Sequence, residues 1–384
     1  MAKRPKKTTE VELPPPAPPE GPRPIPMSSI IGQDRAIGIL MEALKHKRIH
    51  HAWIFNGPPG VGKFTTALAF AALLLDPTTQ LTFGGELLAD PDSQVQTLVR
   101  AGTHPDLFVV NKELARFSDE KSVRDSKQIS IAKQVVDQFV LQPGAMAPSV
   151  RNEGAAGRVF IIDEADLMNA ASQNALLKFL EEPPERMVII LVTSSEERLL
   201  TTIRSRAQRV YFGSLGQRGI EEWLARQELE IPDDERAWLI RFAEGSPGVL
   251  RLAHDGRLYE WWQRLEPMLR ELERGQYAVE LGPTMGELVK GWAESWVAAH
   301  KNASKEAANK AGADWMFRLL GNHWRSRLAK AAPMGKSGPY LAAIDAVHNA
   351  EPEMDSNVNI EFVMEKLSSE MTAVFAEAAA AAKA

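Results

Sequence analysis

Cysteine is absent from this chain of 384 residues. Disulfide bonds, thiolate zinc sites and cysteine nucleophiles are therefore excluded. The sequence also lacks a run of about 18 apolar residues, so we expect no transmembrane helix. Prolines and acidic residues, rather than an apolar stretch, follow the basic first residues, which argues against a secretory signal and against a mitochondrial presequence. Together these absences predict a soluble, cytoplasmic protein.

A strong net charge is also lacking. The chain has 45 Lys and Arg residues against 50 Asp and Glu residues, for a formal net charge of −5. This balance argues against a surface coated with nucleic acid, although a local basic face remains open. The length allows two or three domains, because a single core rarely grows past about 250–300 residues.

Proline is frequent in the first 27 residues, and apolar side chains there are too few to form a core. This composition predicts a disordered, extended tail. Beyond them, apolar strands alternate with helices, an order typical of an α/β domain with a parallel sheet and helices on both faces. We assign this domain to residues 28–212, a small helical domain to 213–257 and an all-helical domain to 258–384. The expected strands are 51–55, 106–110, 158–163 and 187–192, the expected helices are 37–44, 65–75, 131–140 and 169–181, and 76–104 is expected to be irregular.

Tryptophans are concentrated in the C-terminal part of the chain, at helical spacing. Such residues most often belong to a core, whereas a stacking platform for nucleic acid would interleave them with many Lys and Arg residues. We therefore interpret them as core residues: Trp261, Trp262, Trp292, Trp296, Trp315 and Trp324.

The segment Gly57-Pro58-Pro59-Gly60-Val61-Gly62-Lys63 matches the phosphate-loop pattern G-x-x-x-x-G-K, between a predicted strand and a predicted helix. The glycines let the backbone turn so that successive N–H groups point at phosphate oxygens. The helix that follows adds the positive end of its dipole, and Lys63 supplies a mobile charge for the outer phosphates. The segment therefore predicts descent from nucleotide-binding proteins, with Gly57, Gly60, Gly62 and Lys63 as binding residues.

The residue after the lysine departs from that pattern. A Ser or Thr hydroxyl there normally binds magnesium, whereas this chain has Phe64. Thr65 follows and is a candidate nucleotide contact, but one helical step turns its side chain by about 100° from the metal position. We expect hydrolysis to be severely weakened, while ATP or ADP can still occupy the degenerate site. In the alternative interpretation, Phe64 simply packs as a core aromatic.

A second nucleotide motif is complete in this sequence. The apolar strand that ends at Ile162 leads into Asp163 and Glu164. Asp163 would hold magnesium through water, and Glu164 would polarise the attacking water, a role that Phe64 makes vestigial. Carboxylates in this place can also be mere strand terminators. Thr193 and Ser194 follow the last predicted strand, where a polar side chain, which we assign to Thr193, could sense a γ-phosphate or simply cap a helix.

The run Ile203-Arg204-Ser205-Arg206-Ala207 follows that strand. An arginine here could reach out of its own subunit and supply transition-state charge to a neighbour's nucleotide. Alone, such a pair of arginines is a solvated surface feature, but its position after both nucleotide motifs favours an arginine finger, which we assign to Arg206. The histidines show no metal-ligand spacing, so we expect no metal site.

Several runs together resemble the clamp-loader branch of AAA+ proteins, and within it the delta-prime-like subunits of bacterial DNA polymerase III. These runs are Ile31-Gly32-Gln33, His51-Ala52-Trp53, 101–106 (AGTHPD), 163–169 (DEADLMN), 173–184 (QNALLKFLEEPP), 202–206 (TIRSR) and Gly245-Ser246-Pro247-Gly248. The resemblance covers about residues 28–255. The last helical region resembles the family's collar domain only in position and helicity.

The resemblance implies an AAA+ domain, a helical lid and a collar within a hetero-pentamer that also contains delta and tau/gamma motor subunits. Such a ring uses ATP to open a sliding clamp and to place it on primed DNA. A delta-prime-like subunit belongs to the DNA-directed DNA polymerase holoenzyme as a stator with weak or absent ATPase activity. Its Ser-Arg-Cys motif lends an arginine finger to a neighbour. Here the motif matches Ser205 and Arg206, with Ala207 in place of the cysteine.

Two further departures from the family bear on function. The four-cysteine zinc module is missing, so we expect no zinc. Motor subunits carry a nucleotide-sensing arginine soon after their lid Gly-Ser, where this chain has Gly248; whether Arg251 substitutes for it is left open. Together with Phe64, these features favour a non-hydrolysing subunit. The alternatives are a working ATPase, either a tau/gamma motor or a branch-migration helicase, and a nucleic-acid adaptor.

Overall fold

The computed structural model describes residues 25–124, 130–149, 154–227, 229–299, 305–356 and 359–381. The predicted N-terminal tail lies, up to residue 24, outside the described residues. The chain divides into two compact units. The first ends at Phe212 and leaves out Pro58–Val61, whereas the second comprises Pro58–Val61 together with the chain from Gly213 onward.

The first unit is built on a five-stranded sheet in the order β4-β5-β6-β1-β7, with every neighbouring pair parallel. The strands are β1 (Ala52–Asn56), β4 (Leu107–Val110), β5 (Arg158–Ile162), β6 (Met187–Thr193) and β7 (Gln208–Tyr211). Strands β1, β5 and β6 are buried almost throughout, as expected for parallel strands covered on both faces. The predicted α/β architecture with a parallel sheet is therefore confirmed.

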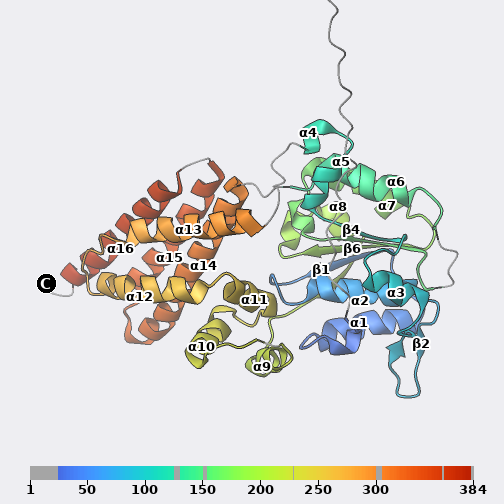
Figure 1. Ribbon diagram of the computed structural model, residues 1–384, viewed down its shortest axis with the longest axis horizontal. Coiled ribbons are helices and arrows are strands. Elements are labelled where there is room, and N and C mark those ends of the chain that lie inside the picture. The colour runs from blue at the N-terminus through green and yellow to red at the C-terminus, as the bar shows by residue number, and fades with distance from the viewer. Residues whose placement is uncertain are drawn as a thin grey trace, which may run out of the picture. The chain divides into compact units, whose positions relative to one another are not determined.

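Helices cover both faces of this sheet (Figure 1). On one side lie α1 (Asp34–Lys45), α2 (Lys63–Leu75) and α3 (Gln94–Arg100). On the other side lie α5 (Lys133–Val136), α6 (Gln142–Gly144) and α7 (Ala170–Glu181), and a π-helical turn at Asp137–Leu141 joins α5 to α6. The remaining short helices of this unit are α4 (Lys121–Arg124) and α8 (Thr201–Arg204).

The expectation of an irregular segment at 76–104 is wrong. This segment contains a hairpin of β2 (Gln80–Leu81) and β3 (Leu87–Leu88), followed by α3. The Ser93 hydroxyl begins α3 by accepting a hydrogen bond from the Gln96 N–H at 3.0 Å. The capping hydroxyl and the two buried valines of α3, Val95 and Val99, fix this short helix against the rest of the unit.

The second unit consists of helices in its described part, apart from the loop segment Pro58–Val61. They are α9 (Gln217–Ala225), α10 (Asp233–Phe242), α11 (Pro247–Asp255), α12 (Leu258–Glu273), α13 (Leu281–Ala299), α14 (Lys305–Ala331), α15 (Gly338–Ala350) and α16 (Ile360–Ala381). Trp261 and Trp324 are buried, as the interpretation of the tryptophans as core residues predicts. Trp296 instead is exposed and stacks on Trp292.

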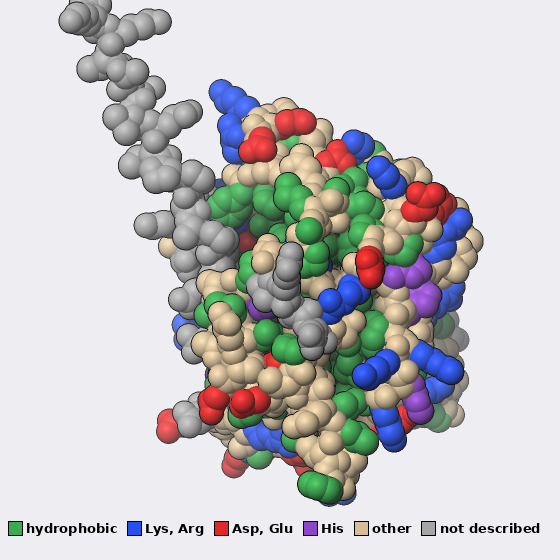
Figure 2. Space-filling model, turned by 90° about the vertical axis from the view of Figure 1, so that its right-hand side faces the viewer, with side chains coloured by type: hydrophobic (Ala, Val, Ile, Leu, Met, Phe, Trp, Pro, Cys, Tyr) green, Lys and Arg blue, Asp and Glu red, His purple; other side chains and the backbone are tan. Residues whose placement is uncertain are grey.

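The molecular surface mixes charges of both signs. On the face seen in Figure 2, Lys and Arg side chains are spread among Asp and Glu side chains and hydrophobic ones. Within the described ranges, none of the helices combines the length and the apolar character needed to span a bilayer.

Candidate nucleotide-binding site

Three neighbouring strands end at the same edge of the sheet. The phosphate loop follows β1, Asp163 follows β5, and Thr193 ends β6 with Ser194 behind it. Because ligands bind at the carboxyl edge of a parallel sheet, the strand order brings Lys63, Asp163 and Thr193 to one place.

The phosphate loop has the backbone conformation that its glycines permit. Gly57 has a φ of +153°, and a Cβ atom there would collide with the Phe212 carbonyl oxygen. Gly62 has a φ of +99° and directly precedes the first residue of α2. A side chain at either position would be strained, so the glycines are required by the shape of the loop.

Lys63 lies almost entirely inside this site, with 5% of its surface exposed. Its Nζ donates hydrogen bonds to the Gly57 carbonyl oxygen at 2.6 Å and to Ser194 Oγ at 3.1 Å. Burial lowers the pKa of Lys63 to about 8, against the opposing effect of Asp163 and Asp166. Burial disfavours the charged form of Lys63, and a phosphate bound in the loop would stabilise that charge.

Asp163 has the opposite shift. Burial raises its pKa to about 6, and the neighbouring Glu164 carboxylate adds to the rise, while the Glu164 N–H and the Lys63 charge oppose it. The Glu164 N–H donates to Asp163 Oδ1 at 3.0 Å. The Glu164 carboxylate itself forms an ion pair with Lys112 at 3.0 Å and is exposed. The carboxylate assigned to water activation is thus engaged by a lysine.

Replacing Asp163 by asparagine should make stability less dependent on pH. The pKa of about 6 in the folded chain exceeds the ordinary 3.8, so the unfolded chain loses this proton first and stability falls as pH rises through that window. This difference between the two pKa values of Asp163 lowers the free energy of unfolding at high pH by about 3 kcal/mol at most. We expect Asp163→Asn to raise the free energy of unfolding at pH 8 by up to that amount and to change it little at pH 4.

Urea unfolding of both proteins at the two pH values measures this effect. Glu164→Gln, which removes the exposed neighbouring carboxylate, is the matched control and should change the difference between the two pH values far less. Equal pH dependence in wild type and Asp163→Asn would show that Asp163 carries no raised pKa.

The hydroxyl that contacts the phosphate-loop lysine comes from Ser194. Thr193, the residue assigned from the sequence, is buried and donates to Asp166 Oδ1 at 2.8 Å. The sequence pointed to Thr193 and Ser194 together and assigned Thr193, whereas Asp166 was not singled out as a site residue. The polar pair after β6 was the available signal, but spacing alone does not tell which of two adjacent hydroxyls faces the loop.

Phe64 lies in the first turn of α2, and its side chain is half-buried. It has no oxygen atom that could bind magnesium there. Thr66 donates its hydroxyl to the Gly62 carbonyl oxygen at 2.8 Å, and Thr65 is half-buried on the same turn. In the part of the chain that the structure describes, no cluster of three His, Asp or Glu residues could hold a metal ion. Phe64 therefore leaves this turn without the hydroxyl that usually binds magnesium.

In the second unit, the tip of the phosphate loop packs against the start of α11. The Gly248 N–H donates to the Gly60 carbonyl oxygen at 2.8 Å, and Ser246 Oγ donates to the Pro59 carbonyl oxygen at 2.7 Å. A Cβ atom on Gly248 would lie 2.7 Å from the Cα atom of Gly60. No side chain, and hence no sensing arginine, fits at position 248 without a backbone shift.

Arg251 is one helical turn further along α11. Its Nε donates to both carboxylate oxygens of Asp255, at 3.0 and 2.8 Å. The side chain that could replace the missing sensing arginine is thus paired within its own helix.

Arg206 lies just beyond α8, and its side chain is 37% exposed. Its guanidinium forms an ion pair with Glu181 at 3.1 Å and donates to the Thr202 carbonyl oxygen at 3.1 Å. Glu181 is the last residue of α7 and part of the Leu-Glu-Glu-Pro-Pro run. The sequence did not indicate this contact, because the two residues come from separate elements.

The parallel sheet, the glycine loop that holds Lys63 and the carboxylate after β5 define a P-loop fold. The family model described as "DNA polymerase III, delta subunit" matches residues 32–216. The tau/gamma subunit of Haemophilus influenzae is 30% identical over 60% of this chain and 30% of its own length. The delta' subunit of Pseudomonas aeruginosa is 31% identical over 59% of this chain and 63% of its own length.

Residues 32–216 are thus similar in sequence to clamp-loader subunits of DNA polymerase III. The matched part spans less than two thirds of either relative. Among solved structures, the Thermotoga maritima RuvB Holliday junction branch migration motor matches 61% of this chain and 65% of its own, with a TM-score of 0.38 and 20% identity.

Proposed function

We propose that this chain is a delta-prime-like stator subunit of the cytoplasmic clamp loader of DNA polymerase III. In that role it sits in a hetero-pentamer with delta and tau/gamma subunits and assists the ATP-dependent loading of a sliding clamp on primed DNA. The observation that carries the proposal is the combination of Phe64 at the magnesium position with a partly exposed Arg206.

The chain's own site is suited to hold a nucleotide rather than to cleave it. The loop glycines and Lys63 can bind the phosphates of ATP or ADP, with Asp163 and Thr193 at the same edge of the sheet. Hydrolysis needs charge neutralisation by magnesium and by cationic side chains. Phe64 supplies no metal ligand, and Gly248 supplies no cation and leaves no room for one.

Arg206 is suited to act on a neighbouring subunit. Its ion pair with Glu181 is partly solvent-exposed on both sides, and such pairs contribute about 0–1 kcal/mol. A phosphate group of an adjacent nucleotide can therefore take the place of the Glu181 carboxylate at little cost. The planar guanidinium suits the charge that spreads over the phosphoryl oxygens during transfer.

The motor role is the second candidate. Tau/gamma relatives match this chain with identities of 30–31%, as the delta' relative of Pseudomonas aeruginosa does at 31%. Overall similarity does not separate the two roles, so the distinction rests on Phe64 and Gly248. A motor subunit needs an active site that turns over by itself.

The isolated chain should therefore release no phosphate from magnesium ATP above background. Phe64→Thr alone should not restore turnover, because position 248 still lacks the sensing arginine. Steady-state phosphate release measures both, and binding of a fluorescent nucleotide with and without magnesium shows whether the loop is loaded. Magnesium-dependent turnover of the wild-type chain that Lys63→Ala abolishes would establish the motor role instead.

A further inference from the structure

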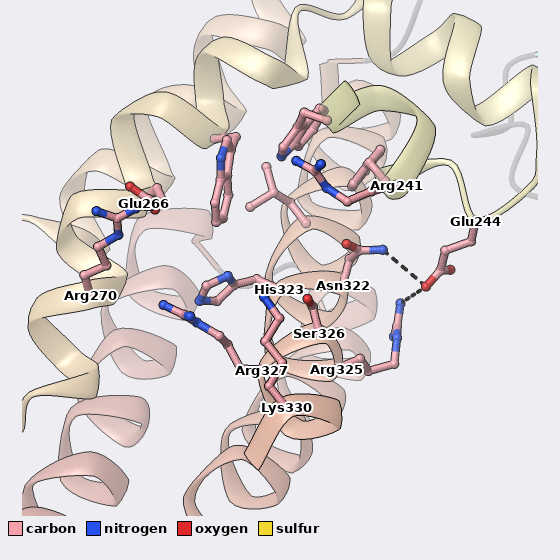
Figure 3. Close-up of a pocket in the computed structure, with 14 residues that line it drawn as sticks. Arg241, Glu244, Glu266, Arg270, Asn322, His323, Arg325, Ser326, Arg327 and Lys330 are labelled. Atoms are coloured by element: carbon pink, nitrogen blue, oxygen red, sulfur yellow. Dashed lines mark hydrogen bonds and ion pairs between the residues drawn. The ribbon is translucent and has the colours of Figure 1, made fainter. Parts of the chain in front are cut away.

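The second unit contains a pocket of about 770 Å³ between residues of α10, α12 and α14 (Figure 3). It shares no residue with the phosphate loop or with the surroundings of Arg206. Its lining combines arginine and lysine side chains with Trp238, Trp262 and His323. The composition is that of a site for an anion with a planar part.

Cations outnumber carboxylates in this pocket. Its lining includes Arg241, Arg270, Arg325, Arg327 and Lys330, against the carboxylates of Glu244 and Glu266. Three of the cations are compensated, since Arg325 pairs with Glu244 at 3.2 Å, Arg270 pairs with Glu266, and Arg327 pairs with Glu273 at 2.6 Å.

The other two cationic side chains, those of Arg241 and Lys330, have no hydrogen-bond or ion-pair partner among the described residues. In Figure 3, Arg241 and Lys330 come from different helices, α10 and α14, on either side of His323. Two uncompensated charges that line one cavity are matched by a doubly charged anion or by two singly charged ones.

His323 is the buried polar group of this pocket. It is 9% exposed, and its Nε2 is fully buried, with no hydrogen-bond partner among the described residues. A carboxylate oxygen of Glu273 lies 4.0 Å from it. Burial and the facing charges of Arg327, Lys330 and Arg270 lower the pKa of His323 to about 3. The same positive field favours an anion in the cavity.

An aromatic wall completes the pocket. The Trp238 and Trp262 rings lie 6.4 Å apart at an interplanar angle of 27°, and Trp262 is 5.1 Å from the His323 ring. Trp262 is half-buried and lines the pocket, so part of it faces the cavity. A tryptophan beside arginines favours a nucleobase, which gains stacking energy without sequence preference.

We propose that this pocket binds a phosphate group attached to a nucleoside. Arg241 and Lys330 contact the phosphate, Trp262 stacks with the base, and His323 lies beside both as a reporter of binding. The ligand is either a free nucleotide or one unit of a single-stranded nucleic acid. Two unpaired cations together with an aromatic wall fit a nucleotide better than an acidic peptide, which offers carboxylates but no stacking group.

The test uses the full chain with the substitution Lys63→Ala, which removes the first phosphate site, and with isotope-labelled histidine. Thymidine monophosphate and a single-stranded oligothymidylate are titrated separately while the His323 imidazole signal is followed by NMR. We expect a saturable shift of this signal. Arg241→Gln with Lys330→Gln should weaken binding at least tenfold, whereas Arg241→Lys with Lys330→Arg should retain most of it.

Arg236→Gln is the matched control, because Arg236 is exposed on the same helix as Arg241 but does not line the pocket. It should change the affinity less than twofold. Binding of the oligonucleotide without competition from the monophosphate would identify single-stranded nucleic acid as the source, and equal competition would identify the free nucleotide. The proposal is overturned if neither probe shifts the His323 signal, if the double glutamine variant binds normally, or if an oligoglutamate peptide binds as tightly as the oligonucleotide.

Discussion

Replacing Arg206 with alanine is expected to lower the DNA-stimulated ATP turnover of the reconstituted clamp loader while the complex still assembles. An arginine finger supplies about 10³–10⁵ in kcat. Hydrolysis at the neighbouring site that receives Arg206 should therefore fall by at least about a thousandfold. The total ATP turnover of the complex should fall by the fraction that this site contributes to it. Turnover and assembly are measured together, by phosphate release and by size-exclusion chromatography.

Three further variants separate the finger from a general effect of surface charge. Arg209→Ala removes another exposed arginine, which pairs with Glu196 at 3.3 Å, and should leave turnover unchanged. Arg206→Lys keeps the charge but not the planar guanidinium, so most of the rate should still be lost. Glu181→Ala frees Arg206 from its ion pair and should preserve turnover. Normal turnover of an assembled complex that contains Arg206→Ala would refute the finger.

Replacing Asp106 with alanine is expected to destabilise the first unit by about 3–5 kcal/mol, because it leaves a buried guanidinium without its counter-charge. Asp106 is 0% exposed and Arg158 is 4% exposed. The Asp106 carboxylate accepts from Arg158 Nη2 at 3.0 Å and from the Ser149 N–H at 2.9 Å. Arg158 also donates to the carbonyl oxygens of Met146 and Ala147, at 2.9 and 2.8 Å, so this pair fixes the segment that precedes β5.

Urea unfolding of the full chain measures the loss. Asp255→Ala breaks the exposed pair with Arg251 and should cost about 1 kcal/mol or less. The double substitution Asp106→Ala and Arg158→Met should recover part of the loss, since no unpaired charge then stays buried. A loss below about 1 kcal/mol for Asp106→Ala would mean that the pair does not hold this part of the fold together.

Most of the fold could be predicted from the sequence because the central strands are buried on both faces. Such strands consist of continuous apolar runs, as in 187–192 and 159–162. The edge strand β7 was missed, since Gln208, Arg209 and Tyr211 are exposed and only Val210 is buried. Helix α3 was missed because it has seven residues and follows a stretch with glycine and proline turn signals.

The candidate site was predictable where chemistry is fixed by local spacing. A strand, a glycine loop and a helix place Lys63, and a strand end places Asp163. Contacts between distant segments were not predictable. Lys63 hydrogen-bonds to Ser194, which is 131 residues away in the sequence. The Gly248 N–H, from the second unit, hydrogen-bonds to the Gly60 carbonyl oxygen. These contacts depend on strand order and helix packing, which no spacing in the sequence encodes.

In the proposed role, Arg206 promotes ATP hydrolysis in a neighbouring subunit, and the chain's own site does not hydrolyse ATP. The most direct test compares two complexes that differ only in this chain, one with Lys63→Ala and one with Arg206→Ala. Both are assembled with delta, the tau/gamma motor subunits, the sliding clamp and primed DNA, and ATP turnover is measured. We predict near-normal turnover with Lys63→Ala and a marked loss with Arg206→Ala. A marked loss with Lys63→Ala and normal turnover with Arg206→Ala would contradict the claim.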